Sequence, residues 1–161
     1  MPAVSCLRPL CAALLSVPLA IAALPAMSAD SGGSSSSGGT SQSAGVTLAS
    51  ARGQIDAGDY RNALKSLAVI VKAEPRNADA WNLMGFASRK MKQYDNAARY
   101  YETALKIDPK HLGALEYQGE LFVLTQQYDS ARANLKRLQD LCGSCEEAGD
   151  LNKALASAGQ S

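Results

Sequence analysis

Apolar and small residues recur along this chain at the spacing of amphipathic helices, with turn-forming residues between the stretches. In the stretch that begins at Tyr94, such side chains stand at Ala97, Tyr101 and Ala104, three or four positions apart. Because about 3.6 residues make one helical turn, these side chains share one face of a helix. The pattern predicts helices that each present one apolar face.

The pattern also repeats with a fixed period, which divides the chain from Ala44 onward into the blocks 44–77, 78–111 and 112–145. Three columns carry the period: Tyr60, Tyr94 and Tyr128; Ala63, Ala97 and Ala131; and Ala51, Gly85 and Gly119. A repeat of this length, made of two helices and a turn, indicates a stack of helical hairpins that bury their apolar faces against each other. The three blocks therefore predict an all-α fold.

Two features predict where these helices end. Pro75 and Pro109 should end the second helix of their blocks, because proline disfavours helix in the residue before it. After the last block, residues 146–158 carry apolar side chains at helical spacing and predict a closing helix, with Ser144 and Glu147 as a capping box at its start.

The columns resemble the tetratricopeptide repeat family. The block from Ala78 to His111 matches the family order at Trp81, Gly85, Tyr94, Ala97, Tyr101, Ala104 and Pro109. The other two blocks are looser, with Thr47 and Leu115 in place of the tryptophan. The resemblance implies an α-solenoid of three helix-turn-helix repeats and a C-terminal capping helix over residues 46–158. It also implies a protein–protein interaction scaffold that holds a protein or peptide partner in a concave groove, without catalysis.

In this family the groove is lined from the first helix of each hairpin. The resemblance implies the groove residues Leu48, Arg52, Ile55, Asn82, Phe86, Arg89, Glu116, Glu120 and Val123. Their charges suggest a partner peptide of graded charge, with carboxylates at the arginines and basic residues at the glutamates. The alternative is that they are ordinary solvated side chains. The lysine–asparagine clamp by which eukaryotic chaperone adaptors grip a C-terminal carboxylate is not reproduced, because Leu48 and Arg52 occupy its first two places.

The N-terminal part has the layout of an export signal. Arg8 precedes an uncharged, apolar run that ends in small residues, which predicts a cleaved signal peptide over residues 1–29, with an uncleaved anchor as the alternative. Residues 30–45 are rich in serine and glycine and predict a disordered linker. We therefore expect a secreted or periplasmic protein, similar to periplasmic tetratricopeptide proteins that scaffold envelope or pilus assembly.

Charge and composition exclude other classes of partner. Without Arg8, the chain has 16 − 1 = 15 basic residues against 15 acidic ones, and a neutral domain lacks the field that attracts nucleic acid. No later apolar run approaches membrane length. We expect a monomer or weak self-association, and neither a cofactor nor a catalytic residue is predicted.

Cys142 and Cys145 are the two cysteines that follow the signal. In an oxidising compartment such a pair predicts a structural disulfide. The alternative is a thiol–disulfide accessory factor, since this spacing at a helix start favours thiol exchange. Two thiolates are half a zinc site, so no metal is expected. His111 is expected to be an exposed loop residue.

Overall fold

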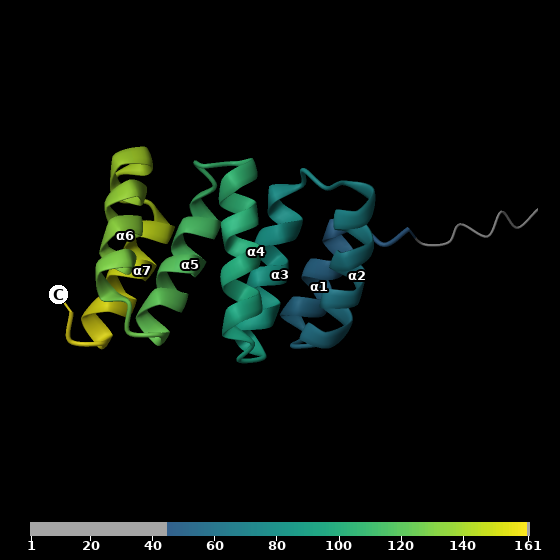
Figure 1. Ribbon diagram of the computed structural model, residues 1–161, viewed down its shortest axis with the longest axis horizontal. Helices are drawn as coiled ribbons and strands as arrows, with labels where there is room; N and C mark the ends of the chain where they lie inside the picture. The colour runs from purple at the N-terminus through teal and green to yellow at the C-terminus, as the bar shows by residue number, and fades with distance from the viewer. Residues whose placement is uncertain (1–44, 161) are drawn as a thin grey trace, which may run out of the picture. The chain divides into compact units, whose positions relative to one another are not determined.

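The computed structural model describes residues 45–160, which form seven α-helices and no β-strand. Figure 1 shows the helices standing side by side in a row from α1 and α2 to α6 and α7. The expected signal peptide over residues 1–29, and the linker up to residue 44, lie outside the described residues. The helices are α1 (Leu48–Asp56), α2 (Tyr60–Ala73), α3 (Ala78–Lys90), α4 (Tyr94–Ile107), α5 (Leu112–Leu124), α6 (Tyr128–Cys142) and α7 (Glu146–Ser157).

The two prolines act as predicted. The helices α2 and α4 end just before Glu74 and Asp108, the residues that precede Pro75 and Pro109. Both residues have left the helical conformation, with ψ angles of 72° and 97°. This is the conformation that the proline ring imposes on its predecessor.

The residues that precede α3, α5 and α7 stand at equivalent positions of the repeat. Asn77 and His111 cap α3 and α5, and their side chains accept hydrogen bonds from backbone N–H groups three residues on. Cys145 holds the same place before α7 without a side-chain cap bond. The predicted capping box at Ser144 is therefore wrong, because Ser144 lies one residue before the cap position.

The turn inside each hairpin uses the left-handed backbone conformation at one fixed position. Gly58, Lys92 and Gln126 stand there with φ angles of 74°, 61° and 61°. In each turn, the N–H of this residue and the N–H of the next residue both donate hydrogen bonds to carbonyl oxygens of the preceding helix. Glycine suits the position, whereas lysine and glutamine adopt it with strain.

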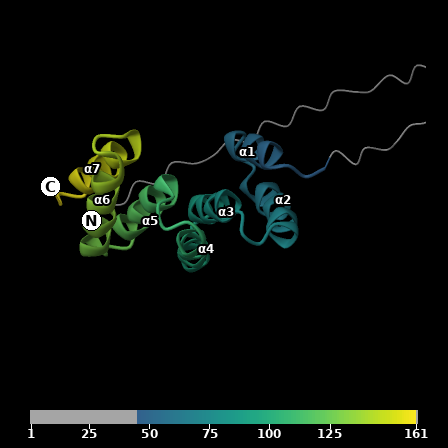
Figure 2. The same cartoon turned by 90° about the horizontal axis from the view of Figure 1, so that it is seen from above.

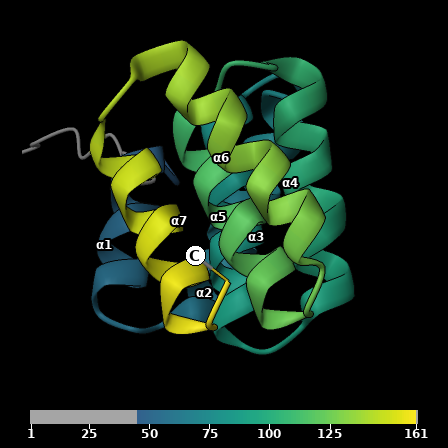
Figure 3. The same cartoon turned by 90° about the vertical axis from the view of Figure 1, so that its left-hand side faces the viewer.

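The helices pack as a solenoid in two rows. Neighbouring helices in sequence pack together, and α1, α3, α5 and α7 also pack on one another in order, so they form one row while α2, α4 and α6 form the other. Figure 2 shows this arrangement from above, and Figure 3 shows it from the end at which α6 and α7 lie. The predicted all-α solenoid is confirmed.

The small-residue columns allow this close packing. Ala63, Ala97 and Ala131 are fully buried. A Cβ atom at Gly85 would overlap the ring of Tyr101 in α4. Gly85 therefore leaves room for Tyr101, and Gly119 leaves room in the same way for Leu151 of α7.

The last helix covers the end of the stack. Ala148, Leu151 and Leu155 of α7 are buried against Leu115 and Leu138 of the third hairpin. The predicted capping helix is therefore present. Among residues 45–160, none of the helices is long and apolar enough to cross a membrane.

Candidate functional site

The nine residues predicted to line the groove differ in how much of each side chain meets solvent. Arg52 is the one that is exposed, and Ile55, Asn82 and Glu116 are buried. The other five, Leu48, Phe86, Arg89, Glu120 and Val123, are partly buried. All nine come from α1, α3 and α5, which pack side by side. The structure brings them onto one row of helices, and a partner could reach only some of them directly.

A hollow of about 220 Å³ lies between these three helices. It is lined by Arg52, Ile55, Asp56, Leu83, Phe86 and Tyr117. Three of these were predicted, and sequence reasoning missed Asp56, Leu83 and Tyr117. Leu83 and Tyr117 stand one repeat period apart, each directly after a predicted groove residue. The repeat period itself could therefore have identified this second column.

Arg89 is held inside the protein rather than presented to a partner. Its guanidinium lies 2.6 Å from Glu120 Oε2, and its Nε donates to the hydroxyl of Tyr101 at 3.4 Å. It also lies over the rings of Phe86 and Tyr117, at 5.4 and 5.5 Å from their centres. Its side chain is only 9% exposed. Glu120 therefore already pairs with Arg89 in the protein alone, and the pairing of Arg89 with a partner's carboxylate stays a prediction.

Glu116 is also unlike the solvated charge that the sequence suggested. Burial raises the pKa of its carboxyl group to about 8, with further contributions from the negative charges of Glu120, Asp150 and Glu147. Glu116 is therefore mostly uncharged at pH 7. The two ends of the proposed charge gradient are thus altered: Arg89 is neutralised by Glu120, and Glu116 is largely protonated.

His111 connects the second and third repeats at the N-terminal ends of α3 and α5. Its Nδ1 accepts the N–H of Ala114, so Nε2 carries the proton and donates to Asp79 Oδ1 at 3.2 Å. Asp79 also lies 3.6 Å from the guanidinium of Arg52. The expectation of an exposed loop histidine is wrong, because its side chain is only 14% exposed and caps α5.

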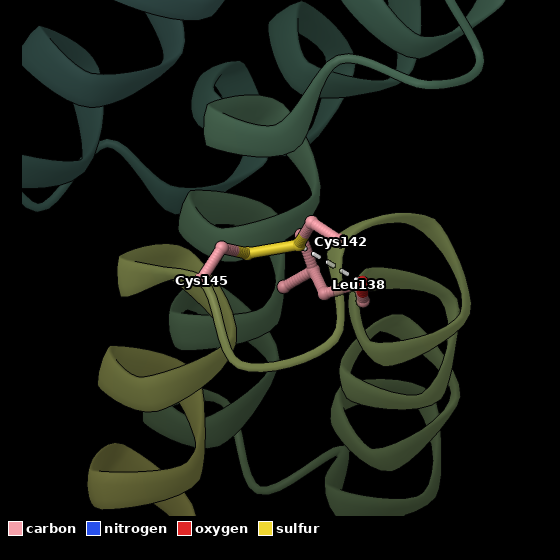
Figure 4. The surroundings of a disulfide bond; sticks show 3 residues. All are labelled: Leu138, Cys142 and Cys145. Carbon is pink, nitrogen blue, oxygen red and sulfur yellow. Dashed lines mark hydrogen bonds between the residues drawn. A yellow bond between two sulfur atoms is a disulfide. The ribbon is translucent and has the colours of Figure 1, made fainter.

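The cysteine pair lies where α6 ends and α7 begins (Figure 4). The structure joins Cys142 and Cys145 in a disulfide, and Cys142 Sγ lies 3.1 Å from the carbonyl oxygen of Leu138. A surface hollow of about 220 Å³ lies beside Cys145. Both the structural role and the redox role of this pair stay predictions.

Among residues 45–160, no three histidine, cysteine or carboxylate side chains are grouped so that they could hold a metal ion. The acidic and basic side chains on the groove helices mostly face one another in pairs. What the site offers is a hollow with apolar, aromatic and charged walls.

Two family models match this chain, and both describe a tetratricopeptide repeat. They cover residues 48–87 and 78–111. Among curated proteins, tetratricopeptide repeat protein 37 of Xenopus laevis is 34% identical over 82 residues, which are 51% of this chain and 5% of that protein. Human superkiller complex protein 3 is 32% identical over 108 residues, 67% of this chain and 6% of that protein. The chain spans about one twentieth of the length of these relatives.

Solved structures share the fold. The TPR2B domain of yeast Sti1, in a complex named for pHsp70, superposes with a TM-score of 0.63 at 18% identity, over 68% of this chain and 90% of that one. The Yersinia enterocolitica type III secretion translocator chaperone SycD gives 0.62 at 19% identity, over 69% and 79%. The first repeat domain of Spaghetti (RPAP3), bound to the HSP90 peptide SRMEEVD, gives 0.62 at 18% identity, over 69% and 89%.

Proposed function

We propose, from the premise that this chain belongs to the tetratricopeptide repeat family, that it is a non-catalytic scaffold which binds a partner protein or peptide on its groove helices. In this family the stacked hairpins bury their apolar faces in one another and leave one row of helices free for binding. The described residues follow that plan, because α1, α3 and α5 together shape one hollow.

The hollow is the observation that carries this proposal. Leu83, Phe86 and Tyr117 give it an apolar and aromatic wall, and Arg52 stands at its edge with a side chain that is 53% exposed. A few apolar side chains beside a charged group are typical of a site that holds one anchoring side chain of a peptide. Arg52 is placed to pair with a carboxylate next to that anchor.

The solved neighbours support a peptide partner without identifying it. Two of them are complexes with chaperone-derived partners, named for pHsp70 and for an HSP90 peptide. In the present chain Leu48 and Arg52 stand where the lysine–asparagine clamp of chaperone adaptors would begin. The partner we propose is therefore held through an apolar anchor rather than through its C-terminal carboxylate.

The test is to select peptides from a display library on the wild-type protein and to measure their affinities for three variants. Leu83→Glu places a charge in the hollow, and Arg52→Glu reverses the charge at its edge. Val69→Glu is the control, because Val69 lies on α2 and is already 55% exposed. We expect at least tenfold weaker binding for Leu83→Glu, a smaller loss for Arg52→Glu, and no loss for the control. Equal effects in Leu83→Glu and Val69→Glu would refute binding in the hollow.

We also propose that the protein works in the periplasm, in envelope or pilus assembly. The support is the signal-like layout of residues 1–29 and the paired cysteines, which suit an oxidising compartment. The mass of the intact protein, purified from an exporting bacterium, tests this point. We expect a mature chain that begins at Ala29 or Asp30, and a full-length cytoplasmic protein would contradict it.

The second candidate function is that of a thiol–disulfide accessory factor. Its support is the position of Cys145 at the start of α7, where helix N–H groups stabilise a thiolate, and the hollow beside it. An insulin-reduction assay tests it directly, with a Cys142→Ser, Cys145→Ser double variant as the control. Activity that the double variant lacks would establish the redox role, whereas an inactive wild type would leave the pair structural.

A further inference from the structure

Two residues of opposite charge, both on α1, line the hollow between α1, α3 and α5. They are Arg52 and Asp56, and the aromatic wall beside them includes Phe86 and Tyr117. Arg52 and Asp56 stand about one helical turn apart but do not pair with each other. The guanidinium of Arg52 lies 3.6 Å from Asp79 Oδ1 instead. The hollow is therefore bordered by a cation that already has an anionic neighbour and by a carboxylate that has no cation.

Asp56 is the last residue of α1, which is an unfavourable place for a carboxylate. The last carbonyl groups of a helix give its C-terminal end a partial negative charge, so basic side chains are preferred there. The last turn of α1 contains no basic residue, and within residues 45–160 the carboxylate of Asp56 forms no hydrogen bond or ion pair. Lys90, at the end of α3, lies over the ring of Phe86 at 5.1 Å from its centre and does not pair with Asp56 either.

The other carboxyl groups at helix C-terminal ends in the described domain have partners inside the protein. Each accepts a hydrogen bond from a neighbour in sequence: Glu74 from Asn77, Asp108 from Lys110, and Asp140 from Lys136. Asp56 differs from them because it lines a hollow and has no partner. A residue that departs from a local rule without compensation inside the protein is typical of a functional site.

We propose that Asp56 selects partner segments with a lysine or arginine beside the apolar anchor, so that the anchor is flanked by a basic residue at Asp56 and an acidic one at Arg52. The inference rests on the proposed function and adds a defined charge order to the partner peptide. A cation at this place pairs with the carboxylate and also lies near the last carbonyl groups of α1, and both interactions are favourable.

The spacing of the two charges suits an extended peptide. Arg52 and Asp56 are four residues apart in α1, which is about 6 Å along the helix axis. Alternate residues of an extended chain are about 6.5–7 Å apart. The residues on either side of one anchor can therefore reach Arg52 and Asp56 together. The basic contact then lies on α1, beside the hollow, and not at the glutamates of α5 that the sequence suggested.

The experiment uses fluorescein-labelled, amidated peptides that carry one phenylalanine between a glutamate and a lysine, in both orders. The matched probes carry acetyl-lysine, which keeps the length of lysine without its charge. Fluorescence polarisation gives the affinities for the wild type, Asp56→Asn, Asp56→Lys and Leu83→Glu. Asp95→Asn is the control, because it makes the same change of charge at an exposed residue of α4, in the other row of helices.

In about 50 mM salt, we expect the wild type to bind the lysine probe of one order about two- to fivefold more tightly than its acetyl-lysine counterpart. Asp56→Asn should lose this preference, and Asp95→Asn should keep it. Asp56→Lys should instead prefer a probe in which glutamate replaces the lysine. Urea unfolding should show that Asp56→Asn is at least as stable as the wild type, because the change removes a carboxylate from a helix C-terminal end.

The possible failures are distinguishable. If lysine and acetyl-lysine probes bind equally and Leu83→Glu weakens both, the groove function stands and the cation contact is refuted. If the preference for lysine survives in Asp56→Asn, another group binds the cation and the assignment to Asp56 is wrong. A lower urea midpoint for Asp56→Asn would show that the carboxylate stabilises the fold, which would also overturn the assignment. If no probe senses Leu83→Glu, the proposed function itself fails, and this inference fails with it.

Discussion

Replacing Arg89 by methionine tests whether this residue stabilises the fold or binds a partner. The guanidinium connects three helices: α3, which carries it, α4 through Tyr101, and α5 through Glu120. Methionine keeps most of the apolar stem and removes the charge. The change therefore isolates the ion pair and the contacts of the guanidinium with the aromatic rings.

The magnitude follows from the burial of the pair. Removing one partner of a fully buried ion pair typically lowers the free energy of unfolding by about 3–5 kcal/mol. Glu120 is 26% exposed and can turn towards water, which reduces that figure. Each contact of the guanidinium with a ring adds about 0.5–1 kcal/mol. We expect Arg89→Met to lower the free energy of unfolding by about 2–4 kcal/mol.

Urea unfolding measures this change, followed by the fluorescence of Trp81, the single tryptophan, and by circular dichroism. A double variant, Arg89→Met with Glu120→Gln, should recover at least about 1 kcal/mol, since it no longer leaves a carboxylate unpaired. Arg52→Met is the matched control. Arg52 is mostly exposed and its distance to Asp79 is 3.6 Å, so we expect a change below about 0.5 kcal/mol.

The result that would refute the reasoning is a stable Arg89→Met. If this variant unfolds within about 0.5 kcal/mol of the wild type and loses partner binding, Arg89 is a binding residue, as the sequence first suggested. If its stability falls and the double variant recovers nothing, the rings rather than Glu120 account for the loss.

Three further predictions concern single positions. Glu116→Gln should raise the free energy of unfolding by about 1–2 kcal/mol at pH 7 and by nothing below pH 4. The reason is that folding raises the pKa of Glu116 to about 8, so the wild type loses stability as the pH rises from about 4.5 to 8. Urea titrations across that range should show that the stability of the variant depends less on pH. Lys92→Gly should stabilise the protein by about 0.5–1 kcal/mol, because Lys92 has a φ angle of 61°, and Gly58→Ala should destabilise it, because Gly58 has a φ angle of 74°. Thermal unfolding that ranks the two variants in the opposite order would contradict the argument from backbone strain. Gly85→Ala should lower the free energy of unfolding by about 1–3 kcal/mol, because the new Cβ overlaps the ring of Tyr101. Gly53→Ala, in open space on α1, should be neutral or stabilising. Equal effects of the two changes on the melting temperature would show that Gly85 and Tyr101 are not tightly packed.

Much of the fold could be predicted because the repeat period fixes which positions are equivalent. Once Gly85 and Ala97 were placed in columns, the pairing of helices followed, and Pro75 and Pro109 marked the helix ends. The closing helix was predicted to begin at residue 146, where α7 does begin, but its cap was placed one residue too early, because the serine–glutamate pattern at Ser144 was read without using the column. Asn77 and His111 define that column, and it points to Cys145 as the cap.

The candidate site could be predicted in outline only. The repeat register places Arg89 and Glu116 on the groove helices, and the structure agrees. The register does not say where a long side chain turns. Arg89 pairs with Glu120, which belongs to the following repeat, and this pair depends on how closely α3 and α5 pack. The pKa of Glu116 depends likewise on burial and on two carboxylates of α7, which no local pattern of the sequence brings together.

The short first helix gives the hollow walls of unequal stiffness. With 9 residues, α1 is the shortest of the described helices, and in the described domain it packs against α2 and α3 only. The opposite wall belongs to α3, which has helices on both sides. We therefore expect that a bound side chain too large for the hollow would displace α1 before it displaced Leu83 and Phe86 of α3. Binding of a peptide in the hollow should then be seen most clearly as slower amide hydrogen exchange in α1, away from Leu83 and Phe86, which make most of the contacts with the peptide.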